Sequence, residues 1–195
     1  IYFQFLDASG NSILSDNGMP VCTDNATQIK PRVKASSQGA YVVWEDLRNL
    51  NNDIYSQKFD HTGAIFWEAN GVAIVNEVGI QNQARLTVDA SGGAYYVWSD
   101  ERNNAYPETE VYLQYIDSQG NSAFEQNGLA VCDAEYYQFS PIVRPSSNGA
   151  LVVWGDRRTG SIGLYVQSIN PSSGIGLEPQ GREMFFGIDG NGQSP

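Results

Sequence analysis

Short apolar runs separated by turn residues occur along the whole chain, and they predict β-strands throughout. Each run spans five to eight residues rich in Val, Ile, Tyr, Phe and Trp, and clusters of Ser, Asn, Asp and Gly lie between the runs. No segment has the 3.6-residue periodicity of an amphipathic helix. The strands come in groups of four, here named A to D. The first complete group covers residues 31–35, 40–45, 54–59 and 64–67, with D continuing over 72–75.

Strand B of each group ends in a Trp-x-Asp-x-Arg motif that the chain contains three times. The tryptophans lie 54 and 56 residues apart, and self-similarity at about 20–50 residues is typical of solenoids, propellers or arrays. Residues 40–44 are apolar at every position, so both faces of strand B should be buried, as they are in blades stacked around an axis. The motif residues are Trp44, Asp46, Arg48, Trp98, Asp100, Arg102, Trp154, Asp156 and Arg158.

Other markers recur in a fixed order with this motif. Glutamines stand at positions 28, 83, 138 and 193, a constant spacing of 55 residues. An apolar-Tyr-x-Gln run follows each motif, and an Asn-Gly or Gln-Gly pair comes last. We therefore predict an all-β protein, a β-propeller built of four-stranded antiparallel blades of about 55 residues, with three full blades plus a partial one.

The markers also divide the chain. Residues 1–27 hold strands C and D of a preceding blade, and residues 193–195 begin a next one. The whole blades are residues 28–82, 83–137 and 138–192, in one continuous propeller domain. Because the smallest propellers have about four blades, we expect this chain to be a fragment of a longer propeller.

The repeat unit resembles the propeller-like repeats of large secreted and cell-surface bacterial proteins. The resemblance rests on Trp-x-Asp-x-Arg followed by apolar-Tyr-x-Gln-x-x-Asp-x-x-Gly, and it covers nearly the whole chain. It implies an extracellular or cell-surface location. A looser likeness, over residues 60–67, is to the Asp-box of sialidase-type propellers, which is a turn that braces the fold and implies no sialidase activity.

Charge and cysteine content restrict the partners. The net charge of −11 argues against nucleic acid or an anionic membrane surface as partner, because both require clustered Lys and Arg. No apolar run approaches the roughly 18 residues of a membrane-spanning helix, so we expect no membrane insertion. Cys22 and Cys132 occupy the same repeat position two repeats apart, too far for a disulfide, and we expect buried free thiols.

A binding site should lie where the repeat is broken, because a feature present in every blade is more often structural. For this reason we expect each motif Asp to accept backbone N–H groups of its turn, and each motif Arg to pair with a neighbour. The loops that follow strands B and D differ between blades, and they emerge on one face of a propeller. Aromatic rings beside carboxylates suit a carbohydrate. The predicted ligand-binding residues on this face are Tyr106, Glu108, Glu135, Tyr136 and Tyr137.

The main functional prediction is a non-catalytic binding or structural module that recognises a glycan or a protein through this face. One alternative is a glycoside hydrolase or lyase, with catalytic carboxylates among Glu108, Glu110, Asp133 and Glu135. Another is self-association through open strand edges. His61, the only histidine, is expected to be a turn residue. No cofactor is predicted, although residues 51–53 and 189–192 offer weak calcium-ligand patterns.

Overall fold

The computed structural model describes residues 1–103 and 108–186, and every regular element in these residues is a β-strand. A short antiparallel pair comes first, formed by β1 (Tyr2–Phe3) and β2 (Met19–Pro20). The first sheet has the order β3 (Gln28–Ser36), β4 (Gly39–Asp46), β5 (Asp53–Phe59), β6 (Val72–Val75). The second sheet has the order β7 (Gln81–Val88), β8 (Ala94–Asp100), β9 (Glu110–Ile116), β10 (Leu129–Cys132). The third sheet contains β11 (Gln138–Ser146), β12 (Gly149–Asp156) and β13 (Gly163–Asn170), with β14 (Gly174–Ile175) and β15 (Arg182–Phe186) both paired to β13.

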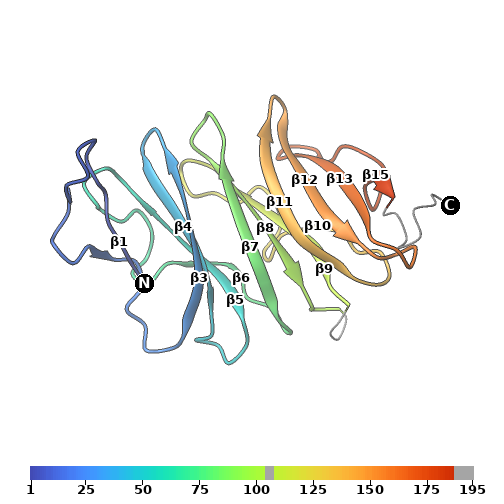
Figure 1. Cartoon of the computed structure of the whole chain (residues 1–195), viewed down its shortest axis with the longest axis horizontal. Coiled ribbons are helices and arrows are strands. Elements are labelled where there is room, and N and C mark those ends of the chain that lie inside the picture. Colours follow the sequence, from blue (N-terminus) through green and yellow to red (C-terminus); the bar gives the residue numbers. More distant parts are fainter. Residues whose placement is uncertain (104–107, 187–195) are drawn as a thin grey trace.

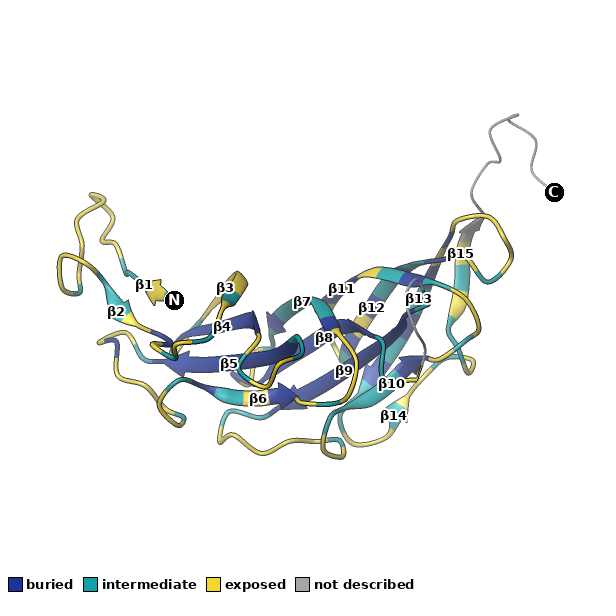
Figure 2. Cartoon of the chain, turned by 90° about the horizontal axis from the view of Figure 1, so that it is seen from below, coloured by how far each residue is buried: buried dark blue, intermediate teal, exposed yellow. Residues whose placement is uncertain are grey.

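The three sheets lie side by side along the long axis of the molecule (Figure 1). Viewed at right angles they form an open arc, with β3, β7 and β11 on the concave side and β6, β10 and β14 on the convex side (Figure 2). The described sheets do not close into a ring. The predicted all-β architecture of four-stranded antiparallel sheets without helices is confirmed for the described residues. None of these residues forms a helix that could cross a membrane.

Successive side chains of the second strand in a sheet pack against opposite neighbours. In β4, Trp44 packs toward the β1–β2 pair, whereas Tyr41 and Val43 pack against the second sheet. In β8, Trp98 packs against the first sheet. Every residue of β4 and β8 is buried, which confirms the prediction for these two strands. In β12, outward-facing residues such as Leu151 are exposed, because no described sheet covers that face.

The predicted start of strand D, residues 64–67, is wrong: this segment forms only one isolated bridge, to Phe59. A side chain satisfies its backbone instead. Gln57 Oε1 accepts the N–H of Trp67 at 3.1 Å, and Gln57 Nε2 donates to the carbonyl of Glu68 at 2.8 Å. A side-chain amide offers the donor and acceptor of a peptide group, so it can replace a strand partner. The Tyr-x-Gln glutamines of the other units do the same, namely Gln4, Gln114 and Gln167.

The constant 55-residue spacing of the glutamines selects the wrong residue in the second repeat. Strand register makes Gln81, not Gln83, the equivalent of Gln28 and Gln138, since these three each pair with the aspartate of the motif. Each of the three also donates its amide to a carbonyl of the loop before its strand. Gln83 lies at a bulge in β7, with a left-handed φ of 57°. The longer loop between β8 and β9 makes the second repeat longer than the first, so equal spacing is not equal position.

The Asn-Gly and Gln-Gly pairs fasten each sheet to the one before it. Asn127 and Gly128 have left-handed φ values of 68° and 88°, and the N–H of Gly128 closes a turn by donating to the carbonyl of Glu125 at 3.0 Å. Asn127 Oδ1 accepts the N–H of Asn76, in the loop that follows the first sheet, at 3.0 Å. Asn70 and Gln180 make the same contact with Thr23 and Asp133 at 2.9 Å. These pairs are therefore staples between neighbouring units.

We expect Gly128→Ala to lower the free energy of unfolding by at least about 3 kcal/mol. A Cβ there would lie 2.6 Å from Cη2 of Trp98 and 2.8 Å from the carbonyl oxygen of Leu113. The clash would add to a left-handed strain of about 1 kcal/mol. Gly10→Ala is the matched control, because Gly10 has a φ of 85° and a Cβ there would meet no described atom within 4 Å. Chemical denaturation of both variants measures the difference, and equal losses would contradict the steric explanation.

Candidate functional site

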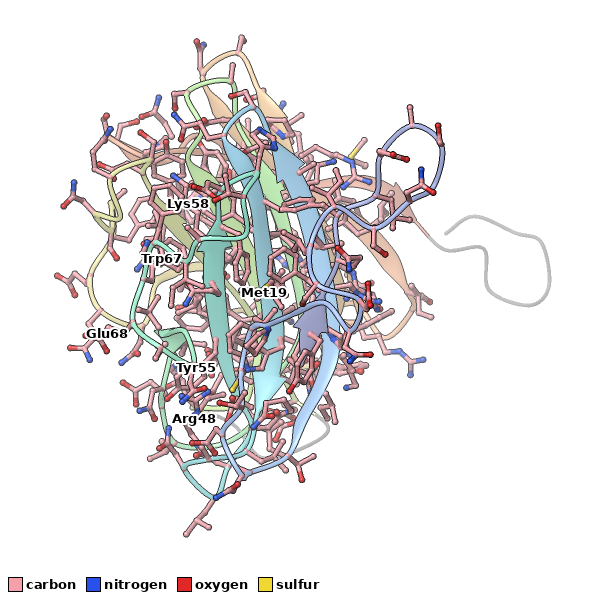
Figure 3. All side chains as sticks on the ribbon, turned by 90° about the vertical axis from the view of Figure 1, so that its left-hand side faces the viewer. Met19, Arg48, Tyr55, Lys58, Trp67 and Glu68 are labelled. Atoms are coloured by element: carbon pink, nitrogen blue, oxygen red, sulfur yellow. The ribbon has the colours of Figure 1, made fainter. Side chains whose placement is uncertain are left out.

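The Trp-x-Asp-x-Arg motif builds the same side-chain cluster at the end of the second strand of each sheet. In the first sheet, Asp46 accepts hydrogen bonds from Trp44 Nε1 at 2.8 Å and from the backbone N–H of Arg48 at 3.0 Å. Arg48 Nη2 pairs with the same carboxylate at 2.6 Å and donates to the carbonyl of Asn70 at 3.0 Å. The guanidinium lies 3.9 Å from the centre of the Tyr55 ring (Figure 3). The clusters of Asp100 and Asp156 repeat these contacts.

These contacts give the motif a bracing role in the strand end and its turn. Burial raises the pKa of Asp46, but hydrogen bonds from Arg48 and Trp44 outweigh it and hold the pKa below its ordinary value. The backbone N–H contact agrees with the prediction. The expectation that Arg pairs with a neighbour is wrong, because two residues of turn bring the Arg48 guanidinium back onto Asp46 of its own motif.

The two cysteines adjoin these clusters and are buried free thiols, as predicted. Cys22 Sγ lies 3.4 Å from Arg48 Nη2, and Cys132 Sγ lies 3.0 Å from Arg158 Nη2. Burial raises the pKa of Cys132 to about 11, so this thiol stays protonated at neutral pH. A buried protonated thiol packs as a small apolar group and is a poor nucleophile.

The repeat symmetry is broken where the second and third sheets meet, and the loops there enclose a pocket of about 290 Å³. Its lining residues come from three connections, β8–β9, β10–β11 and β12–β13: Glu108, Tyr136, Tyr137, Arg157 and Gly160. Backbone hydrogen bonds of 3.0 Å tie the loops together, from Gln138 N to Thr109 O and from Arg157 N to Tyr137 O. The Tyr137 ring stacks on Phe139 with 4.9 Å between the ring centroids, and this contact fixes the position of Tyr137 in the pocket lining.

Tyr136 has an unusual backbone for so large a side chain. Its φ is 71°, and the equivalent position of the preceding loop is occupied by Gly79, with a φ of 82°. The buried Gln138 donates its amide to the carbonyl of Tyr136 at 3.1 Å. Tyr136 is nevertheless 54% exposed. A left-handed conformation costs a non-glycine residue roughly 1–2 kcal/mol, and such strain persists most often at functional positions.

The corresponding junction between the first and second sheets is built differently. Asn51 Nδ2 crosses it, donating to the carbonyls of Glu77 at 2.5 Å and Gly79 at 3.2 Å. The hollow there, about 520 Å³, is wide and contains no aromatic ring among its described lining residues. Its prominent apolar side chain is Leu50, fully exposed, with a φ of 72°. The aromatic pocket is therefore specific to the second junction.

Three of the five predicted ligand-binding residues, Glu108, Tyr136 and Tyr137, line this one pocket. Glu135 is exposed nearby but does not line it, and Tyr106 lies outside the described residues. Sequence reasoning missed Arg157 and Gly160. A signal for Arg157 existed, since the residue before the motif Arg is Leu47 in the first copy and Glu101 in the second.

The four carboxylates proposed for glycoside hydrolysis do not all line the pocket, although the charge of Asp133 acts on Glu110. Glu110 is buried and accepts a hydrogen bond from Asn103 at 2.8 Å, and burial raises its pKa. Asp133 is bound by Gln180, which belongs to the staple described above. Glu108 is the one carboxylate among the described residues that line the pocket. The described part of the site therefore presents a single acid, whereas both glycosidase mechanisms need two.

No group of three or more His, Cys, Asp or Glu side chains that could hold a metal ion occurs in residues 1–103 and 108–186. Asn51 and Asn52 use their Nδ2 atoms in hydrogen bonds to Glu77, Gly79 and Glu45. The other weak calcium pattern, residues 189–192, lies outside the described residues. His61 Nε2 lies 3.2 Å from the carbonyl of Ser37, next to a turn, as expected.

No protein-family model matches the chain, and no curated protein sequence matches it. Among solved structures, one similar chain is the endo-arabinase from Bacteroides thetaiotaomicron VPI-5482, with 9% sequence identity and a TM-score of 0.46. The similarity covers 88% of this chain and 63% of that one, so this chain spans less than two thirds of the enzyme's length. It does not identify the function of this chain.

Two buried aspartates, paired across β4 and β5, should respond to pH in opposite directions. Burial raises the pKa of Asp53, against the lowering effect of a hydrogen bond from Asn49, whereas the pKa of Asp46 is lowered. The folded protein therefore binds a proton at Asp53 more tightly than the unfolded chain does, and at Asp46 less tightly. As the pH rises above about 4, the ionisation of Asp53 lowers the free energy of unfolding. As the pH falls below about 4, the protonation of Asp46 lowers it.

We test this with Asp53→Asn and Asp46→Asn, measuring the free energy of unfolding from about pH 2 to pH 7. Stability relative to the parent should rise toward pH 7 for Asp53→Asn. Asp46→Asn should cost about 3 kcal/mol at pH 7, because it breaks a buried ion pair, and less as pH falls. Parallel pH profiles for the two variants would contradict this assignment.

Proposed function

We propose that this chain is a non-catalytic binding module that recognises a carbohydrate through the pocket of Glu108, Tyr136, Tyr137, Arg157 and Gly160. The observation that carries the proposal is Tyr136, an exposed ring held at a strained backbone position where the preceding loop has Gly79. The ring is therefore not needed to form a turn at this position. We also propose an extracellular or cell-surface location, as the repeat pattern implies.

The chemistry of the pocket supports a sugar as ligand. Aromatic rings pack against the C–H faces of sugar rings, and a carboxylate and a guanidinium at the rim can accept and donate hydroxyl hydrogen bonds. Tyr136 and Tyr137 supply the rings, and Glu108 and Arg157 supply the polar groups. Arg157 forms no ion pair among the described residues, so its donors are available to a ligand.

We further propose that the sheets are blades of a β-propeller. The arc of sheets, the first strands on its concave side and the staples between neighbours support this proposal (Figure 2). The blade boundaries predicted from the sequence belong to the same proposal. An experimental structure of the natural full-length polypeptide tests it, since a closed ring of such sheets is expected and an open row would contradict it.

Assembly is a second candidate, because the outer face of the third sheet exposes apolar side chains. Ile142, Leu151, Leu164 and Met184 are 39–60% exposed, and a depression of about 400 Å³ lies among neighbouring residues. Such a surface favours contact with another protein surface. Measuring the native mass over a range of concentrations tests this, and a monomer at all concentrations would rule out self-association through this face.

For carbohydrate binding, the decisive variant is Tyr136→Gly. Glycine adopts a φ of 71° without strain, so we expect the variant to be as stable as the parent or more stable by about 1 kcal/mol. Its affinity should fall about tenfold, because a stacked aromatic ring contributes roughly 1.4 kcal/mol. Calorimetric titration with cello-, xylo-, galacto- and arabino-oligosaccharides measures this.

Leu50→Gly is the matched control, because Leu50 is also exposed, with a φ of 72°, but lies at the first junction. It should gain similar stability and leave carbohydrate affinity unchanged. The proposal fails if no oligosaccharide of the panel binds, or if Tyr136→Gly binds as well as the parent.

A further inference from the structure

The positive charges of this acidic chain are concentrated on its three innermost strands. Strands β3, β7 and β11 carry five of the eleven Lys and Arg residues and no Asp or Glu. These five residues are Lys30, Arg32, Lys34, Arg85 and Arg144. Since the whole chain has a net charge of −11, the remainder carries −16. These three strands form the concave side of the arc (Figure 2), and they are basic in an otherwise acidic chain.

The strand register lines up the cations of neighbouring sheets. Arg32 pairs with Val43 and Arg85 with Val97, so the two arginines occupy equivalent positions on adjacent inner strands. Their charges act on each other: burial and the charge of Arg32 lower the pKa of Arg85. Like charges on neighbouring strands raise the free energy of the folded protein, and the charge of Glu45 offsets this only in part, since the pKa of Arg85 is lowered overall.

Little in the described residues neutralises this row. Lys30 pairs with the buried carboxylate of Glu45 at 3.0 Å, and in the described part of the chain this is the one ion pair that involves an inner strand. Glu45 also accepts Asn52 Nδ2 and the N–H of Gln83, both at 2.9 Å, so both of its oxygens are engaged. Arg85 donates through Nη1 only to nearby backbone carbonyls. Arg32 has no ion-pair partner among the described residues and is exposed.

We propose that the concave side of the arc, formed by β3, β7 and β11 and here called the groove, binds an acidic polysaccharide, with Arg32 and Arg85 holding carboxylate groups of its sugars. Guanidinium groups bind carboxylates through paired hydrogen bonds, and a concave surface of one charge focuses the field on a ligand. The third sheet has Ile142 at this position, so the repeated cations are the pair Arg32 and Arg85. Two cations at the same position of adjacent strands suit a ligand that carries its charges at intervals along its length. The choice of a sugar polymer over an acidic peptide rests on the carbohydrate pocket proposed above.

The test measures binding of polygalacturonate to the whole chain by calorimetry, in calcium-free buffer at low and high NaCl. Binding should weaken steeply with salt, as expected for charge pairing at an exposed groove. Methyl-esterified polygalacturonate, which has the same sugars without the charge, should bind at least tenfold more weakly. Equal binding of both polymers, or no binding of polygalacturonate at low salt, would overturn the proposal.

The variant Arg32→Gln/Arg85→Gln should lose at least tenfold in affinity for polygalacturonate. Arg32→Gln alone, at an exposed position, gives a second readout that does not risk the fold. Arg182→Gln is the matched control, because Arg182 is an exposed cation paired with Glu178 outside the groove, and it should bind normally. Unchanged affinity in the double variant would overturn the groove assignment.

Two further measurements separate recognition of charge from recognition of a polysaccharide, and the groove from the pocket. If poly-L-glutamate binds as tightly as polygalacturonate, the groove recognises charge alone and the assignment to a polysaccharide is wrong. Tyr136→Gly, measured with the neutral oligosaccharides, reports on the pocket independently of Arg32 and Arg85. Failure of the groove and failure of the carbohydrate pocket therefore give different results.

Discussion

The structure depends on a buried carboxylate at the end of the second strand of each sheet. Asp46 is fully buried, and it is tolerated there because an indole N–H, a backbone N–H and a guanidinium all bind it. The same arginine then reaches the turn before the last strand through the carbonyl of Asn70. One carboxylate therefore connects three parts of the sheet, and removing it would leave the half-buried Arg48 guanidinium without its counter-charge. This explains why the motif recurs as a unit.

The contacts between sheets follow from this arrangement. Asn70 contacts both its own sheet and the preceding unit. Its carbonyl accepts a hydrogen bond from Arg48, and its side chain accepts the N–H of Thr23 in the preceding loop. The adjacent Gly71 lies against Trp44, where a Cβ would come within 2.4 Å of the indole. The turn thus couples the internal cluster of one sheet to the previous sheet. A substitution in such a turn would disturb the contact between two sheets. This restricts the sequence of the turns and keeps the repeats alike outside the loops.

The sequence predicted those parts of the fold that repeat, because repetition makes a weak signal visible. Strands, turns, buried thiols and the bracing role of Asp46 all followed from it. Errors arose where a side chain replaces the backbone, as Gln57 does for residues 64–67, since an amide in a strand has no distinctive pattern. The position of Gln83 was misassigned because loop length varies between repeats. Arg157 joins the pocket through a backbone contact with Tyr137, which spacing in the sequence does not reveal.

The two proposed sites relate to the repeat in opposite ways. At the pocket, a single loop replaces the Gly79 type of turn with the strained, exposed Tyr136, so the site exists once. In the groove, by contrast, Arg32 and Arg85 share one repeat position on the first two sheets, and the third sheet has Ile142 there. An acidic exterior would repel an anionic polymer from every surface except this groove, so the net charge of −11 would orient the ligand rather than exclude it. Weak contacts repeated along one polymer then combine, whereas the pocket selects a single sugar.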